Sequence, residues 1–290
     1  MAPQNRTAFL AAVALLVGVL SGCVDGAVTA GTNGASDPAL SDHGKEDSPV
    51  SLAVNYAVID APAGGVPVRD IPSTDGAVVG VVTEENGGLV GTGDSTTEGD
   101  TLWIEVKGER NGWIDATNLT EWVDPDTFCN DERAYGVFEA FSSAMTSSLP
   151  DEFQSVVSPR HGLWLVLTPD GTDGHEVHLD NVGSWDALLE TNFDWGTNPQ
   201  NGAAVSGTFA ELGLPELTDV LLDGGDLRCN RFPQGAGNFL VGIPHGLENL
   251  NFFTVSTRYD GAWLSWLVGF DVVGHAPYVT YVARLGRDDF

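Results

Sequence analysis

The residues that could carry chemistry in this chain are its 6 histidines and its 41 carboxylate side chains. His175 and His178 flank Glu176 in a stretch with the composition of a metal-binding pair. We expect this stretch to be a strand, where residues three apart point to opposite faces, so the two imidazoles cannot easily share one ion. The HExxH spacing of helical zinc sites is absent. The pattern therefore favours no bound metal.

His161 is the candidate for acid–base chemistry. It follows Pro159 and Arg160 at an expected turn, where an imidazole could act as a general base. A structural histidine with satisfied hydrogen bonds is the alternative interpretation. The chain contains no G-x-S-x-G elbow, P-loop or dinucleotide-binding fingerprint. These observations favour a protein without catalytic activity, and leave open a hydrolase-type enzyme that uses His161 and a nearby acid.

One loop has the composition of a calcium site. Asp170 and Asp173 lie in the stretch DGTDG, which is rich in carboxylates and glycine. It lacks the D-x-D-x-D-G spacing and the later bidentate glutamate of a calcium-binding loop. A single weak calcium ion is thus the one cofactor that the sequence leaves open, and we expect no other.

The net charge of the chain limits the classes of partner that it is expected to bind. It has 41 Asp and Glu against 12 Lys and Arg, a formal net charge of −29. Nucleic acids attract basic surfaces, so this charge argues against nucleic-acid binding. It also opposes adsorption to an anionic membrane. The acidic side chains form either a solvated surface suited to a saline medium or a surface that binds cations.

The N-terminus predicts export and anchoring. Residues 7–20 carry no charge, a length typical of a signal peptide and short of the roughly 20 residues of a spanning helix. Leu20-Ser21-Gly22-Cys23 follows and resembles the lipobox of bacterial lipoproteins. The resemblance implies that residues 1–22 are removed and that acyl chains on Cys23 hold the protein on a membrane. Residues 23–51 are then the lipidated cysteine and a flexible tether, because small and polar residues dominate them.

Two further cysteines, Cys129 and Cys229, would lie in a compartment that permits disulfides. We expect them to pair, closing a loop that stabilises the fold by roughly 4–5 kcal/mol in the chain-entropy model. Two free buried thiols are the alternative. The chain has no CxxC motif, which excludes a zinc ribbon.

Residues 52–123 alternate short apolar runs with turn residues, as small β-barrels do. Four stretches carry a resemblance to bacterial SH3 domains of the SH3b type: Val66–Thr74, Val78–Val82, Trp103–Val106 and Asn111–Ile114. The resemblance implies a small all-β SH3-like barrel. The chain departs from the family pattern at Ile71, where glycine is usual, and in an acidic stretch, 93–100, expected to form an expanded loop.

Three tryptophans of this region are the candidate ligand-binding residues. Trp103, Trp113 and Trp122 could line a groove for a peptide or a glycan, since some SH3b domains bind peptidoglycan peptides. The alternative is that their rings pack the core and rim of the barrel.

Residues 129–290 predict an α+β domain with helices packed on one curved antiparallel sheet. Tyr135, Phe138, Phe141 and Met145 recur at helical spacing, and a short turn is expected over Asp151–Val157. Two later helices are expected within 183–190 and 208–224, the second opening on a Thr208–Glu211 capping box. The expected strands are within 161–168, within 175–180, Asn238–Ile243, Leu250–Tyr259, Ala262–Val272 and Pro277–Leu285.

This part is similar to the C-terminal domain of uncharacterised bacterial lipoproteins, on the stretches VVSPRHGLWLVL and WGTNPQNGAAVSGTFAEL. A cone-shaped fold of the nuclear-transport-factor-2 type is the structural analogy. The resemblance implies no activity.

Together these patterns predict a lipid-anchored protein of the cell envelope, on the periplasmic face of a membrane or on the cell surface. The expected function is non-catalytic binding, with peptidoglycan or another envelope protein as the partner. An enzyme with a cleft in residues 129–290 is the competing class, and a purely structural or assembly lipoprotein is a third.

Overall fold

The computed structural model describes most of the chain after residue 53, and all of these residues belong to one compact unit, Pro49–Phe290. The described residues are 54–85, 88–108, 110–147, 150–167, 177–179, 185–197, 202–232, 246–259 and 262–287. The predicted signal peptide, Cys23 and the tether therefore lie outside them. Among the described residues no helix is long and apolar enough to cross a membrane.

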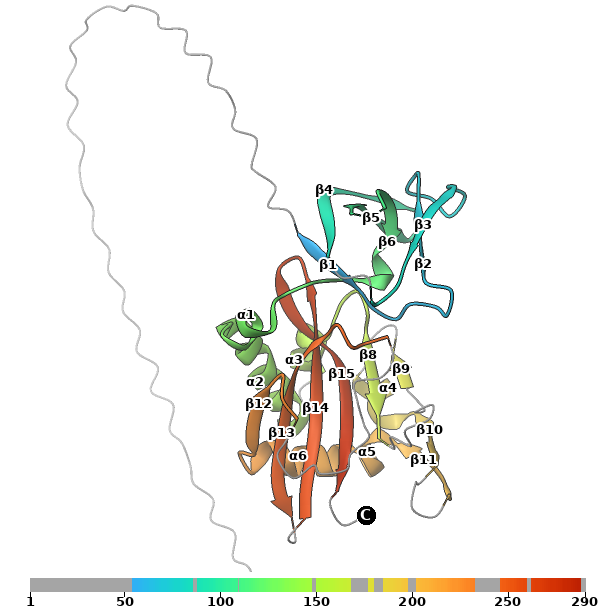
Figure 1. The fold of residues 1–290 in the computed structure, drawn as a ribbon. Helices are drawn as coiled ribbons and strands as arrows, with labels where there is room; N and C mark the ends of the chain where they lie inside the picture. Colours follow the sequence, from blue (N-terminus) through green and yellow to red (C-terminus); the bar gives the residue numbers. More distant parts are fainter. Residues whose placement is uncertain are drawn as a thin grey trace, which may run out of the picture. The chain divides into compact units, whose positions relative to one another are not determined.

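The first part is a seven-stranded antiparallel sheet in the order β3-β2-β6-β5-β4-β1-β7 (Figure 1). Its strands are β1 (Asn55–Val58), β2 (Val66–Arg69), β3 (Val78–Val82), β4 (Leu89–Glu98), β5 (Thr101–Lys107), β6 (Gly112–Asp115) and β7 (Leu119–Glu121), with a 3₁₀ turn at Ala116–Asn118. Strand β2 alternates buried and more exposed side chains, as the period of two requires, whereas all three residues of β7 are buried. The buried set forms a hydrophobic core of its own, which includes Val58, Val68, Ile104, Ile114 and Leu119.

The second part is a six-stranded sheet in the order β12-β13-β14-β15-β8-β9 (Figure 1). It consists of β8 (Leu163–Val166), β9 (Val177–Leu179), β12 (Asp226–Cys229), β13 (Asn251–Tyr259), β14 (Ala262–Val273) and β15 (Ala276–Arg287). All neighbours are antiparallel except β15 and β8, which run parallel. Register shifts at Ser265/Trp266 and Gly269/Phe270 interrupt the long β14–β15 ladder, and such irregularities bend a sheet.

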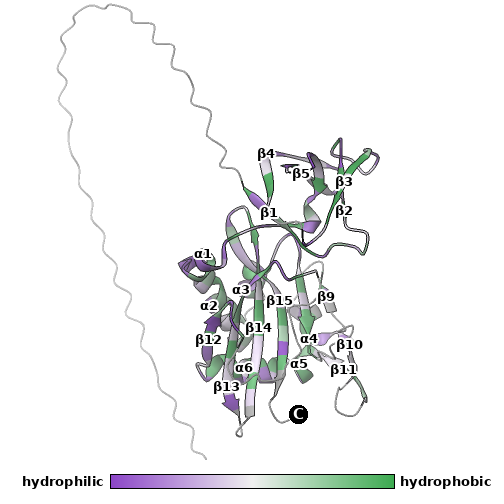
Figure 2. Ribbon diagram, in the orientation of Figure 1, coloured by the Kyte–Doolittle hydropathy of each residue, from purple (hydrophilic) through white to green (hydrophobic). Residues whose placement is uncertain are grey.

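Helices pack on one face of this second sheet, and hydrophobic residues recur along its central strands (Figure 2). They are α1 (Pro125–Cys129), α2 (Glu132–Ser147), α3 (Pro150–Val156), α4 (Trp185–Glu190), α5 (Phe209–Leu212) and α6 (Leu214–Leu222). A separate hairpin, β10 (Asn192–Thr197) with β11 (Ala204–Thr208), completes the fold. The opposite face has a second apolar cluster around Trp164, Leu250 and Leu267. A curved sheet with helices on one face confirms the predicted mixed α+β class.

The predicted helical spacing and the capping box are confirmed. Phe138, Phe141 and Met145 are buried in α2, and Tyr135 remains 37% exposed. Thr208 accepts a hydrogen bond from the Glu211 amide while the Glu211 carboxylate accepts one from the Thr208 amide.

Two local expectations were wrong, and one hairpin was missed. The acidic stretch 93–100 is not an expanded loop, because β4 continues through Glu98 and pairs Glu98 with Thr101. Residues 151–156 of the expected turn are helical in α3, which Asp151 and Glu152 favour by their place in its first turn. The β10–β11 hairpin was not predicted. The predicted strand Asn238–Ile243 lies outside the described residues.

Candidate functional site

The structure separates the three predicted tryptophans. Trp103 on β5 is only 2% exposed, whereas Trp113 on β6 is half-buried and Trp122, just after β7, is 46% exposed. None of the three belongs to the core cluster of the first sheet. Trp103 and Trp113 share one face, because Trp103 pairs with Asp115 and Glu105 pairs with Trp113 on the neighbouring strand.

Trp122 does not join them along the sheet. The strand order β6-β5-β4-β1-β7 places three strands between the strand that carries Trp113 and the one that precedes Trp122. The Trp122 amide instead donates to the Asn55 carbonyl, which extends the pairing of β7 with β1. A single groove lined by all three rings is therefore not formed along this sheet.

A different set of side chains lies beside Trp113. Arg69 on β2 and Glu105 on β5 pair with Trp113 from its two sides, so the three form one row across adjacent strands. We call Arg69, Trp113 and Glu105 the tryptophan row. Directly opposite residues on antiparallel strands have Cβ atoms about 4.5–5.5 Å apart. The row thus combines a partly exposed aromatic ring with a guanidinium group and a carboxylate, and all three side chains keep some contact with solvent.

Chemically, the tryptophan row can hold a ligand that has both apolar and polar groups. The indole ring offers an apolar surface, the guanidinium donates hydrogen bonds to carboxylates, and a carboxylate accepts them from hydroxyl or amino groups. Arg69 also donates to the Gly76 carbonyl at 2.6 Å, and Glu105 accepts from the Thr92 hydroxyl at 2.6 Å. These bonds restrict the positions of both charged groups.

His161 lies in a different site, a buried polar cluster around Asp271. His161 Nδ1 is 2.6 Å from Asp271 Oδ2, and the two side chains are 2% and 0% exposed. The Ser158 hydroxyl donates to the same Asp271 oxygen at 2.7 Å. The Thr120 hydroxyl donates to Asp271 Oδ1 at 2.7 Å and accepts from the Val272 amide at 3.1 Å. Asp271 therefore has three side-chain donors from two separate segments, β7 and the turn that contains Ser158 and His161.

The surroundings of Asp271 favour its ionised form. Burial raises the pKa of this carboxyl, but the hydrogen bond and charge of His161 and the hydroxyls of Thr120 and Ser158 lower it by more. The net pKa lies below the usual range of an aspartate, because hydrogen bonds to a carboxylate stabilise the charged form.

This cluster lacks the geometry of a catalytic triad. In a triad the second imidazole nitrogen faces a nucleophile, but His161 Nε2 is buried and has no hydrogen-bond partner among the described residues. The Ser158 hydroxyl bonds Asp271 rather than Nε2, and it also accepts from the Arg160 and His161 amides. The arrangement suits a buried structural connection better than acid–base chemistry.

Glu121 makes a second connection close to Asp271. Its side-chain oxygens accept from the Gly274 amide at 2.6 Å and the His275 amide at 2.9 Å, in the turn between β14 and β15. His275 has a positive φ of 63° in this turn. Glu121 and Thr120 together therefore connect β7 of the first sheet to the β14–β15 hairpin of the second.

Neither Asp271 nor Glu121 was predicted as a site residue. Asp271 lies in the otherwise apolar stretch LVGFDVVG, and an acid inside a buried strand must have partners. That signal was present in the sequence. The identities of the partners were not, since Thr120 and His161 are 151 and 110 positions away from Asp271.

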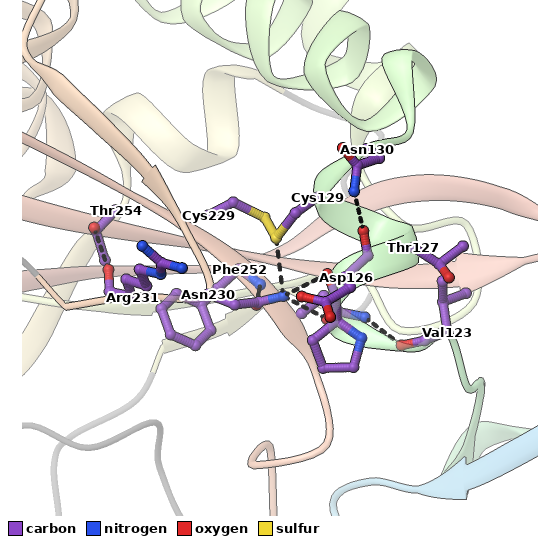
Figure 3. The surroundings of a disulfide bond; sticks show 12 residues. Val123, Asp126, Thr127, Cys129, Asn130, Cys229, Asn230, Arg231, Phe252 and Thr254 are labelled. Carbon is purple, nitrogen blue, oxygen red and sulfur yellow. Dashed lines mark hydrogen bonds between the residues drawn. A yellow bond between two sulfur atoms is a disulfide. The ribbon is translucent and has the colours of Figure 1, made fainter.

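The predicted cysteine pair is at disulfide distance. Cys129 at the end of α1 and Cys229 on β12 have Cα atoms 5.7 Å apart (Figure 3). Asn230 packs beside the bond, with its side-chain amide 3.4 Å from Cys129 Sγ and 2.8 Å from Asn251 Oδ1. Asn251 in turn donates to the Val123 carbonyl at 2.9 Å. This network fixes the segment that leads from the first sheet into α1.

The remaining predicted sites are described only in part. His178 stacks on Trp164 with ring centroids 4.2 Å apart, and its Nε2 lies 2.8 Å from the His161 carbonyl. His175 and the predicted calcium loop lie outside the described residues. Within the described residues, no group of three or more His, Cys, Asp or Glu could hold a metal ion.

Comparison with known proteins finds no match to this chain among protein-family models, curated proteins or solved structures. The resemblances to bacterial lipoproteins and to SH3b domains therefore stay predictions from the sequence.

Proposed function

We propose that the protein is exported, anchored to a membrane by lipid on Cys23, and binds a component of the cell envelope through its first sheet. In this proposal residues 1–22 are a cleaved signal peptide and residues 24–51 are a tether. Residues 52–123 are an SH3b-type barrel, followed by the α+β domain of 129–290. The ligand is peptidoglycan or an envelope peptide.

The strand pattern of the first sheet supports the SH3b proposal. The resembling stretches supply β2, β3, β5 and β6, which are consecutive neighbours in the sheet in the order β3-β2-β6-β5. Gly112, within one of these stretches, has a φ of 153° and stands against the Arg69 backbone, where a side chain would not fit. Such a contact explains why the motif uses glycine at this position.

The cysteine pair supports export. Disulfides persist in oxidising compartments and are rare where glutathione keeps thiols reduced. Cys129 and Cys229 have the separation of a bonded pair and lie against the hydrophobic core of the α+β part. The cysteine pair is therefore consistent with an exported protein.

The tryptophan row is the observation that carries the proposed binding function. It holds an aromatic ring between a cation and an anion, all partly exposed, on regular strands that fix their spacing. Peptide and glycan ligands present the matching groups, namely carboxylates, amides, hydroxyls and apolar ring or side-chain surfaces. The burial of His161 and the bonds of Ser158 favour this function over the hydrolase alternative.

Co-sedimentation of the full chain with purified cell wall tests the proposal. Replacing Trp113 with alanine removes the ring and should lower the bound fraction at least about tenfold, as loss of a central aromatic contact does at other interfaces. Trp122→Ala is the matched control, because Trp122 is more exposed and lies outside the row. Equal loss in both variants, or background sedimentation of the unaltered protein, would refute binding at this row.

A further inference from the structure

Strand β3 forms one edge of the first sheet and is apolar. It reads Val78-Val79-Gly80-Val81-Val82, and no charged residue or proline occurs from Gly76 to Thr83. Val78, Val79 and Val81 are 54%, 43% and 48% exposed. Natural sheets usually protect an edge with lysine, proline, a short strand or a covering segment. This strand has no lysine or proline, and its one irregularity is a register shift against β2 that leaves Val79 without a paired residue.

The other edge strand of the same sheet, β7, differs from β3 because it is covered. At that edge all three residues of β7 are buried, and Thr120 and Glu121 bind the β14–β15 hairpin. Within the described residues, β3 pairs with β2 and with no other strand. No strand of the described part of the chain pairs with the outer row of main-chain N–H and C=O groups of β3, so this row can accept another extended chain.

Charge selects among the chains that could add to β3. Four acidic residues flank the strand, with Asp70 and Asp75 before it and Glu84 and Glu85 after it. The Asp70 carboxylate is fixed beside the start of the strand, because it accepts from the Ala77 amide at 2.7 Å. Asp70, Asp75 and Glu85 are exposed.

Two arginines also approach the strand. Arg69 turns its guanidinium toward the Gly76 carbonyl. The side-chain stem of Arg110 covers Gly80, where an added Cβ would lie 2.5 Å from Arg110 Cγ. Four acids against these two cations leave both ends of β3 acidic around an apolar centre.

We infer that β3 binds an extended segment of a partner protein that adds as a strand, with apolar residues at its centre and Lys or Arg at its ends. A second copy of this chain fits poorly, because antiparallel pairing of two β3 strands would bring Asp75 of one copy near Glu85 of the other. Like charges placed opposite each other destabilise a strand pair. The contact uses main-chain groups of β3 and is independent of a ligand at the tryptophan row.

A designed peptide probes this surface in the full chain. The probe is a synthetic decapeptide with alternating valine and threonine between two lysines at each end. Binding is measured by titration calorimetry, and hydrogen exchange reports on the amides of residues 77–83. We expect the peptide to bind, to slow exchange in that segment and to bind more weakly as salt is raised.

Val81→Lys places a charge on the exposed edge and should weaken binding about tenfold or more. Leu222→Lys is the matched control. Leu222 is 69% exposed on α6, so the new lysine adds the same charge away from β3. A peptide with glutamates in place of the lysines should bind more weakly than the probe. Near-ultraviolet circular dichroism verifies that both protein variants keep the native fold.

Three results would overturn the inference. One is absence of binding by the lysine-flanked peptide, and another is equal binding to Val81→Lys and the unaltered chain. The third is dimerisation of the chain alone that Val81→Lys abolishes, because it would assign the edge to a second copy. Loss of wall binding by Trp113→Ala reports on the tryptophan row and leaves this test unaffected.

Discussion

His161 Nδ1 lies 2.6 Å from Asp271 Oδ2, although the two residues are 110 positions apart in the chain. Asp271 is on β14, and His161 is in the turn that precedes β8, two strands away in the sheet. Because the Asp271 carboxylate accepts this bond, Nδ1 of His161 carries the donated proton. With the hydroxyl of Thr120, this pair joins the turn, the second sheet and the last strand of the first sheet at one buried carboxylate.

The lowered pKa of Asp271 predicts acid sensitivity. Its folded-state pKa is below the unfolded value of about 3.9, so its contribution to stability is fully present above that pH. The contribution is lost as pH falls from about 4 through the lower pKa of the folded state. Urea unfolding at a series of pH values should show this loss.

Asp271→Asn removes the titrating group and is the matched comparison. It should lower the free energy of unfolding near neutral pH by about 2–4 kcal/mol, because two donors that face Oδ2 can no longer both be satisfied. It should also flatten the dependence on pH below 4 relative to the unaltered protein. Asp94→Asn, at an exposed position of β4, should change neither quantity. An unaltered acid slope in Asp271→Asn would contradict the assignment.

The sequence predicted the elements whose patterns are local. The spacing of Phe138, Phe141 and Met145 identified α2, and the capping box identified the start of α5, since both depend on residues within a few positions of one another. The long strands β13–β15 were also predicted, because their apolar runs are bounded by turn residues. The β10–β11 hairpin was missed because both strands contain a glycine, Gly196 or Gly207, and β11 lacks an alternating apolar pattern.

The functional residues were harder to predict for a physical reason. The tryptophan row depends on register, as Arg69 and Glu105 meet Trp113 only through strand pairing. Composition identified Trp113, but no local pattern indicates its neighbours on β2 and β5. The buried cluster likewise depends on long-range packing, so His161 was selected as a candidate while its partner Asp271 was not.

The surroundings of Gly112 and Gly136 predict that substitution by alanine has opposite effects on stability at the two positions. Gly112→Ala should destabilise the protein by more than about 1 kcal/mol, because the φ of 153° disfavours a side chain and the new Cβ would meet the Arg69 backbone. Gly136→Ala should stabilise it by about 0.5–1 kcal/mol, since Gly136 is inside α2 and an added Cβ would meet no atom beyond its own helix backbone within 4 Å. Thermal unfolding of both variants provides the measurement. Equal shifts in one direction would contradict this account of the Gly112 contact.

The Cys129–Cys229 pair predicts a large effect of reduction. A bond that closes a loop across 100 positions restricts the unfolded chain, which corresponds to about 4.7 kcal/mol in the chain-entropy model. The bond also fastens the end of α1 to β12, so its loss should release the segment that Asn230 and Asn251 hold. Urea unfolding with and without a reductant should show a loss of about 2–5 kcal/mol.

The double variant Cys129→Ala/Cys229→Ala controls for effects of the reductant on the rest of the chain. It should unfold at the urea concentration of the reduced protein and should not respond to reductant. Alkylation in denaturant, followed by mass measurement, should label both cysteines only after reduction. Labelling of both without reductant, or equal stability of the reduced and oxidised proteins, would contradict the assigned bond.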